Sequence, residues 1–182
     1  MRVPRLLAAI RRSRFSRDQS AVSAVEFAFI LPIMVVLYLA GFEISEGVTI
    51  NHKVTPATSV LGDLVAQAEQ INDTDMENIF DAATTILNPY PSELMTIVVS
   101  GVAIDEDGVA TVTWSDARNR AAFLPGDVVV LPEGLAQPNT FLVVAEVHFN
   151  YTSPVAYVIT GDVDLTDIFY LRPREGTAVV RI

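Results

Sequence analysis

The sequence contains no cysteine and only two histidines among its 182 residues. The absence of cysteine excludes a disulfide framework, a thiolate metal site and a cysteine nucleophile. The motifs G-x-S-x-G, H-E-x-x-H and G-x-G-x-x-G and the P-loop are also absent, so no common signature of a hydrolase, a metalloprotease or a nucleotide-binding enzyme is present. We therefore expect that the protein is not an enzyme and that it has no catalytic, cofactor-binding or metal-binding residues.

Positive charge is scarce after the first 17 residues. Six of the 12 lysines and arginines lie in those 17 residues, and residues 22–182 contain only six basic residues against 21 acidic ones. The chain therefore has a short cationic head and a long anionic body, and an anionic body argues against binding to nucleic acid. With 51% hydrophobic and only 19% charged residues, the chain as a whole is too apolar to be disordered.

One long apolar stretch follows the cationic head. Residues 21–42 contain one charge, Glu26, and one proline, Pro32. A helix over this stretch is about 33 Å long, which is enough to cross a hydrocarbon core of about 30 Å. Because arginines precede the stretch and only Lys53 follows shortly after it, we predict a single-pass protein with its N-terminus in the cytoplasm. A cleaved secretory signal is the alternative, but the stretch is long and ends without an A-x-A pair.

These features divide the chain into three parts. We predict a basic cytoplasmic leader over residues 1–21, a transmembrane helix over residues 22–42 and an extracytoplasmic domain over residues 43–182. Within the domain we expect a helical start over residues 43–88 and a β-sheet over residues 94–182. The domain is within the usual size range for a single core.

Glu26 is the unusual residue of the apolar stretch. A carboxylate at the centre of a membrane helix costs on the order of 2.5–3.5 kcal/mol by insertion scales, and less near the interface. One interpretation places Glu26 in the headgroup zone, where the positive end of the helix dipole stabilises it. The other interpretation is that Glu26 pairs with a cation of another subunit.

The run RDQSAVSAVEFAFILP, residues 17–32, resembles the N-terminus of the TadE/TadG-like minor pilins (pseudopilins) of the Tad (tight adherence, Flp-type) type IV pilus system. In that family, a prepilin peptidase cuts on the cytoplasmic side of the membrane, after a small residue and five positions before the glutamate. The resemblance therefore implies cleavage between Ala21 and Val22. The family usually has glycine before the cut, and this chain has the similarly small Ala21.

The resemblance also implies what the protein does. It predicts a non-enzymatic minor pilin of the bacterial inner membrane that acts in pilus assembly and cell adhesion, with Glu26, Phe27 and Pro32 as assembly residues. The implied partners are the prepilin peptidase, other pilins and pseudopilins, the pilus assembly machinery and the membrane. The alternative is a membrane-anchored periplasmic binding or adhesion module that does not enter a pilus.

The helical start of the domain contains two predicted breaks. Apolar residues recur with a period close to 3.6 from Ile44 to Ala68, and Thr55 followed by Pro56 predicts that a new helical piece begins there. A second helix is predicted to begin with a capping box between Thr74 and Glu77. The pair Asn88-Pro89 predicts its end.

Beyond Pro91 the apolar period changes to two, which is typical of strands. We predict strands over residues 94–104 and 109–114, joined by a hairpin turn at residues 105–108, because Asp-Gly accepts the positive φ of a tight turn. Further strands are predicted over residues 128–131, 141–151, 168–171 and 177–182. The fold class is therefore α+β, with a long N-terminal helix, a second helix and an antiparallel sheet of roughly four to six strands.

His148 lies on the predicted polar side of its strand, together with Glu146 and Asn150. A lone histidine on a strand is most often structural. A metal site there requires Glu146 or acidic loop residues to converge with His148. A hydrolase site on this face of the sheet is a third interpretation, and it predicts that His148→Ala abolishes activity.

Overall fold

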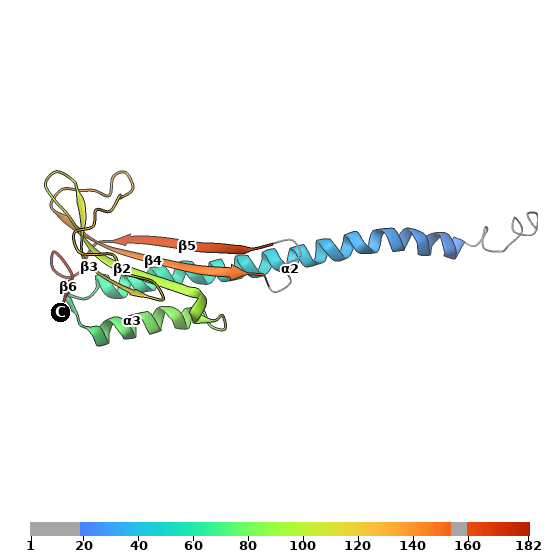
Figure 1. Ribbon diagram of the computed structural model, residues 1–182, viewed down its shortest axis with the longest axis horizontal. Helices are drawn as coiled ribbons and strands as arrows, with labels where there is room; N and C mark the ends of the chain where they lie inside the picture. The colour runs from blue at the N-terminus through green and yellow to red at the C-terminus, as the bar shows by residue number, and fades with distance from the viewer. Residues whose placement is uncertain (1–18, 154–159) are drawn as a thin grey trace, which may run out of the picture.

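Helix α2, Gln19–Ala66, has 48 residues and dominates the shape of the molecule in Figure 1. The structure is a computed structural model that describes residues 19–153 and 160–182, with side chains described from Val22 onward. The N-terminal half of α2 projects away from the other elements, whereas its C-terminal half lies along the four-stranded sheet (Figure 1). At about 1.5 Å per residue, a helix of this size is roughly 72 Å long.

The C-terminal half of α2 packs on the sheet through one apolar stripe. The residues of this stripe are three or four positions apart, and all are at most 1% exposed: Ile50, Val54, Ala57, Leu61 and Val65. Gly62 allows the helix to approach the sheet closely, because a Cβ atom there would lie 3.2 Å from Cβ of Ala145. The stripe therefore fixes the helix on the sheet.

The prediction that a new helical piece begins at Pro56 is wrong, because α2 continues through it. A proline inside a helix costs about 3 kcal/mol, since it removes the hydrogen bond to the carbonyl four residues earlier. Pro56 and His52, whose carbonyl loses that partner, are both exposed, so the carbonyl is free to bond to water. Burial of Val54, Ala57 and Leu61 around the proline, worth about 1.5–3 kcal/mol for each large side chain, outweighs the loss. The helix also continues past Pro32.

The four-stranded sheet is antiparallel and has the order β3-β2-β4-β5. Its strands are β2 (Met95–Ile104), β3 (Ala110–Arg118), β4 (Thr140–Thr152) and β5 (Asp162–Leu171). The predicted hairpin between β2 and β3 is confirmed, with Gly108 at φ 81° in the turn. A predicted strand over residues 128–131 is wrong, because only a single bridge joins Val128 to Thr111.

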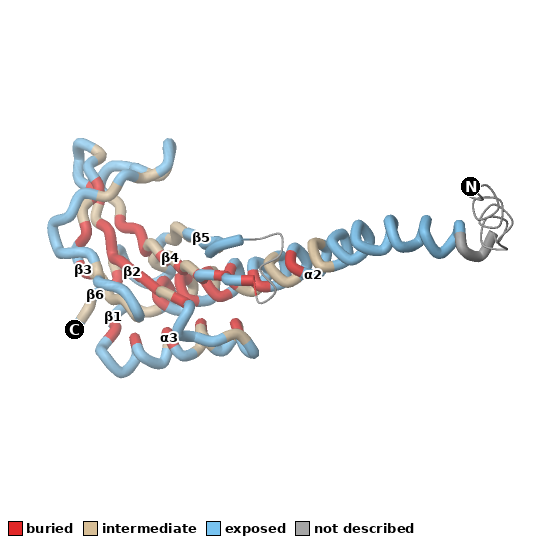
Figure 2. Tube along the Cα trace, turned by 45° about the vertical axis from the view of Figure 1, so that its right-hand side comes forward, coloured by how far each residue is buried: buried red, intermediate tan, exposed pale blue. Residues whose placement is uncertain are grey.

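The alternation predicted for the third long strand is confirmed in β4. Its inward-facing residues are all buried: Phe141, Val143, Ala145, Val147, Phe149 and Tyr151. These side chains join one core with the stripe of α2 and with the second helix. Figure 2 shows the buried stretches of these elements in red. Both helices therefore cover the same face of the sheet, which we call the inner face, and the opposite face we call the outer face.

The second helix, α3, runs over Asp73–Ile86 and buries Met76, Phe80 and Ala83. Its predicted capping box at Thr74 is wrong, because the N-cap is Asn72. The side chain of Asn72 accepts a 2.9 Å hydrogen bond from the backbone N–H of Asp75, whose carboxylate accepts from the backbone of Asn72. Several residues in this run are able to cap a helix, and the one that does, Asn72, directly follows the two-residue strand at Gln70–Ile71.

The end of the chain closes the domain. The predicted strand over residues 177–182 is shorter than expected: β6, Val180–Arg181, pairs in parallel with β1, Gln70–Ile71. The indole Nε1 of Trp114 donates a 2.8 Å hydrogen bond to the carbonyl of Val179 beside it. A short 3₁₀ helix, η2 (Ser92–Leu94), leads from the α3 region into β2. The predicted α+β class, with one long helix, a second helix and an antiparallel sheet, is confirmed.

Candidate functional site

The N-terminal half of α2 carries a large exposed apolar surface, and we call residues 22–42 the exposed segment. Large apolar side chains lie on all sides of this helix, and Figure 2 shows this half of α2 as exposed. The most exposed are Tyr38 at 75%, Phe29 at 74%, Leu37 at 66% and Ile33 at 62%. A helix that is apolar all round is typical of a fully buried environment or a membrane span.

An apolar surface of this extent is unfavourable in water. Covering one large apolar side chain contributes about 1.5–3 kcal/mol, and the exposed segment carries many of them. By length and composition, α2 is able to cross a membrane, and it is the one such helix in the described part of the chain. The exposed segment is therefore the strongest candidate for the functional region.

The residues predicted from the sequence lie along this segment. Val22, Glu26, Phe27 and Pro32 are all exposed, and Ala21 lies in the helix just before the described side chains. Val22 and Glu26 are four residues apart, so they lie on the same side of the helix about 6 Å apart along its axis. The basic residues of the predicted leader, up to Arg17, are outside the described residues.

The boundary between the exposed segment and the domain lies at Glu43, which is 0% exposed. Glu43 was not predicted as a functional residue, although it lies seven positions before Ile50 and therefore on the stripe that packs against the sheet. The hydroxyl of Tyr151 donates a hydrogen bond to the Glu43 carbonyl. Burial raises the pKa of Tyr151, and the neighbouring carboxylates of Glu46 and Glu43 raise it further.

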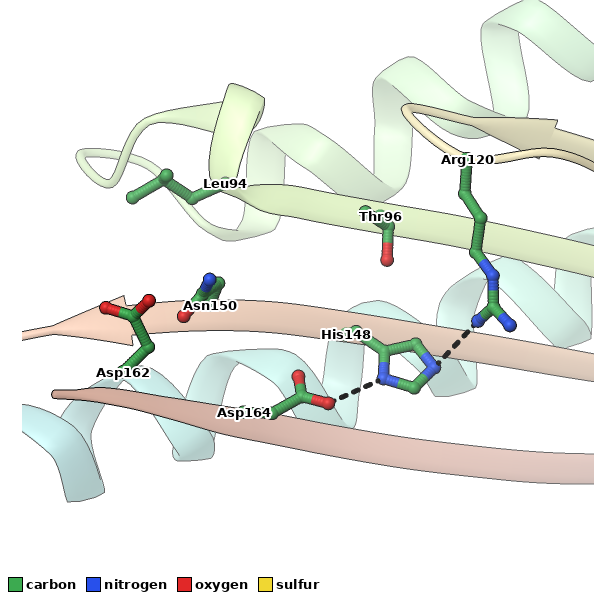
Figure 3. A pocket seen from close by; sticks show the side chains of 7 residues that line it. All are labelled: Leu94, Thr96, Arg120, His148, Asn150, Asp162 and Asp164. Carbon is green, nitrogen blue, oxygen red and sulfur yellow. Dashed lines mark hydrogen bonds and ion pairs between the residues drawn. The ribbon is translucent and has the colours of Figure 1, made fainter.

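A second candidate region lies on the outer face of the sheet, around His148. Its Nε2 atom is 2.6 Å from Oε1 of Glu146, and its Nδ1 atom is 3.1 Å from Oδ2 of Asp164. The hydroxyl of Thr166 is 2.8 Å from Nδ1, and Nη1 of Arg120 is 3.3 Å from Nε2. Figure 3 shows Asp164 and Arg120 on opposite sides of the imidazole ring.

This arrangement differs from a metal centre. The two carboxylates contact opposite nitrogens of the same ring, so they do not converge with His148 on a common point. Among residues 22–153 and 160–182, no group of three or more His, Asp or Glu residues is placed to hold a metal ion. The sequence predicted that Glu146 lies beside His148, and the structure shows this contact. The contacts from Asp164 and Thr166 on β5 and from Arg120 after β3 were not predicted, because these residues are distant in the sequence.

Comparisons with protein family models, with curated proteins and with solved structures gave no match.

Proposed function

We propose that this protein is a minor pilin, or pseudopilin, that acts in the assembly of a Tad-type type IV pilus. The observation that carries the proposal is the continuity of α2, in which an exposed apolar half and a half packed on an acidic domain form one rigid helix. A rigid connection of this kind suits a subunit whose helix inserts among other helices while its domain faces outward. The N-terminal sequence, with Glu26 five positions after Ala21, supports the same assignment.

In this proposal the exposed segment spans the bacterial inner membrane. The arginine-rich leader stays in the cytoplasm and the domain lies in the periplasm or outside the cell. The prepilin peptidase cuts after Ala21, and the mature helix then packs against other pilins, pseudopilins and components of the assembly machinery. These helices and the lipid cover the apolar surface that the chain leaves exposed.

Glu26 has a specific role in this assembly. Cleavage before Val22 creates a free α-amine about 6 Å along the helix axis from Glu26, in apolar surroundings. A lone carboxylate in such surroundings is unfavourable, whereas a carboxylate paired with the α-amine of a neighbouring subunit costs much less. Subunits in the correct register are therefore favoured over subunits that leave Glu26 alone.

The role of Glu26 is tested by Glu26→Ala in a strain with a working pilus system. We expect the variant protein to remain in the membrane, because it loses only a polar group, and we expect piliation to be abolished. Glu106→Ala, on the exposed hairpin tip between β2 and β3, is the matched control and leaves piliation unchanged. Normal piliation with Glu26→Ala contradicts the proposal and favours a simple membrane tether.

The second candidate is a membrane-anchored binding or adhesion module that does not enter a pilus. The observation that favours it is the outer face of the sheet, where polar side chains around His148 remain accessible in a cavity. Both candidates are non-enzymatic and both use the exposed segment as an anchor. Only the pilin proposal requires Glu26 and the processing of the leader.

A further inference from the structure

The outer face of the sheet is not covered by either helix, because α2 and α3 both pack on the inner face. Part of the outer face is covered by the loop between β3 and β4, whose Val129, Leu131 and Leu135 pack on Val102 and Leu142. Beside this loop, two cavities open over β2, β4 and β5. We call these two cavities together the outer-face groove.

The first cavity has a volume of about 420 Å³, and we call it the polar cavity because six of its seven lining residues have polar side chains. Its lining is shown in Figure 3 and consists of Leu94, Thr96, Arg120, His148, Asn150, Asp162 and Asp164. Asp162 and Asp164 are exposed, and within the described residues neither has a lysine or arginine partner. The side chains of Thr96 and Asn150 form no hydrogen bond with any of the residues that the structure describes. This end of the groove therefore offers unused hydrogen-bonding groups and excess negative charge.

The second cavity is mainly apolar and has a volume of about 160 Å³. Its walls include Phe123 and Val130 from the loop, and Val144, Ile168 and Tyr170 from the sheet. Val130 is 91% exposed and Phe123 is 39% exposed, so the loop side of this cavity is open to solvent. This end of the groove is suited to a large apolar side chain.

The register of the strands shows that the two cavities adjoin. On β4, Asn150 and His148 line the polar cavity, and the next outward-facing residues, Glu146 and Val144, line the apolar one. The 2.6 Å contact between His148 and Glu146 marks the junction. On the loop side, the guanidinium of Arg120 lies 6.0 Å from the ring centre of its neighbour Phe123, so these two residues form one wall along both cavities.

The length of the groove follows from the strand geometry. Asp164 in the polar cavity and Ile168 in the apolar cavity are four residues apart on β5. At about 3.4 Å per residue, this separation is roughly 14 Å. An extended peptide covers the same distance with four residues, and residues four apart on an extended chain point to the same side.

We propose that the outer-face groove binds an extended segment of a partner protein in which an arginine or lysine lies four residues from a large apolar residue. The cationic group pairs with Asp162 and Asp164, and its aliphatic stem lies on Leu94. The apolar side chain enters the cavity between Phe123 and Tyr170. Between these two side chains the peptide backbone passes over His148 and the guanidinium of Arg120 beside it.

Charge complementarity favours a different protein over a second copy of this chain. Residues 22–182 contain 21 acidic and only six basic residues, so copies of this domain repel one another. Four of the six cations, Arg118, Arg120, Arg174 and Arg181, are already paired with carboxylates of the same chain. A basic segment of another protein is attracted by the same negative charge that makes copies of this domain repel one another.

The test uses the mature full-length chain in lipid nanodiscs, with labelled methyl groups of leucine and isoleucine observed by NMR. Leu94 reports on the polar cavity and Ile168 on the apolar one. The probe is the blocked peptide Ac-Arg-Gly-Ser-Gly-Leu-NH₂, and its control carries neutral citrulline in place of arginine. We expect the arginine peptide to shift both methyl signals and the citrulline peptide to bind about tenfold more weakly, because a charge-assisted pair is lost.

Substitutions of the acidic residues test whether Asp162 and Asp164 bind the arginine side chain of the peptide. Asp162→Asn with Asp164→Asn is expected to weaken binding of the arginine peptide about tenfold, whereas Glu106→Gln with Asp107→Asn, which changes the net charge equally at the hairpin tip, leaves it unchanged. Equal binding of the arginine and citrulline peptides to the unaltered protein overturns the proposal, as does the absence of shifts at millimolar peptide. If the double variant in the groove does not fold, the comparison of the two peptides still decides the matter.

Discussion

The hydroxyl of Tyr151 donates a hydrogen bond to the backbone carbonyl of Glu43, with 3.4 Å between the two oxygen atoms, at the point where α2 leaves the domain. The two residues are 108 positions apart in the chain. Tyr151 ends the buried row of β4, and Glu43 begins the buried stripe of α2. The contact therefore joins the edge of the core to the base of the exposed segment and helps to hold the helix in one direction.

We predict that Tyr151→Phe makes the domain more resistant to alkali. Burial, with the nearby carboxylates of Glu46 and Glu43, raises the pKa of Tyr151 above its ordinary value of 10.0. The unfolded chain therefore ionises first, and stability that is complete below about pH 10 is lost as the pH rises toward the folded pKa. Urea midpoints measured from pH 8 to pH 11 should fall less in Tyr151→Phe than in the unaltered protein.

Tyr38→Phe is the control for this measurement, because Tyr38 lies on the projecting half of α2 and is not part of the core of the domain. Its pH profile should coincide with that of the unaltered protein. A Tyr151→Phe profile that also coincides contradicts the account of Tyr151.

Gly101→Ala is predicted to destabilise the domain by about 1–3 kcal/mol, as overpacking of a core does. A Cβ atom at Gly101 would lie 2.3 Å from Nε1 of Trp114 and 2.6 Å from Cζ of Phe141, and both rings are rigid. Moving Trp114 also disturbs its hydrogen bond to Val179. The measurement is urea unfolding followed by fluorescence, since Trp114 is the sole tryptophan of the chain.

Gly47→Ala is the matched glycine control. A Cβ atom there would lie 3.6 Å from the Tyr151 ring, which is an ordinary contact, and alanine favours a helix over glycine by about 1 kcal/mol. This variant should be at least as stable as the unaltered protein. Equal destabilisation by both substitutions would show that the crowding around Gly101 is not the cause.

Arg181→Gln is predicted to lower the free energy of unfolding by about 1.5–3 kcal/mol, the usual range for hydrogen bonds to charged groups. The guanidinium bonds to Asp116 at 2.8 Å and also to Asp73, and only 18% of its side chain is exposed. Hydrogen bonds to Asp116 and Asp73 outweigh the effect of burial and raise the pKa of Arg181. Unfolding in urea gives the free energy directly.

Arg174→Gln is the comparison for Arg181→Gln. Arg174 pairs with Asp63, but 60% of its side chain is exposed, and exposed ion pairs contribute less than about 1 kcal/mol. The Arg174 variant should therefore lose less stability than the Arg181 variant. A larger loss of stability in Arg174→Gln than in Arg181→Gln would contradict the role given to the contacts of Arg181 with Asp116 and Asp73.

The parts of the fold that were predictable depend on local patterns. Apolar and polar residues alternate over residues 145–151, and Phe141 and Val143 continue the same face, so the buried face of β4 follows from the sequence. Leu142 is also buried, on the outer face beneath the loop between β3 and β4, so the alternation does not extend over the whole strand. The prediction for β5 covered only residues 168–171, because its acidic first half reads as a loop. These acidic residues form a strand because β4 offers a complete row of hydrogen-bonding partners along Asp162–Leu171.

Other features were not predictable because distant contacts decide them. Pro56 stays inside α2 since the sheet holds the helix on both sides of it. The parallel pairing of Gln70 with Val180 joins residues that no local pattern connects. The same applies around His148, where only Glu146 is close in sequence and the remaining partners come from β5 and from the loop after β3.

The most direct test of the proposed function is the mass of the mature N-terminus, measured on protein extracted from cells with a working prepilin peptidase. We expect the chain to begin at Val22, and we expect a strain without the peptidase to retain the intact leader. A chain that begins at Met1 in both strains, or that is cut beyond residue 42, contradicts the assignment as a pilin.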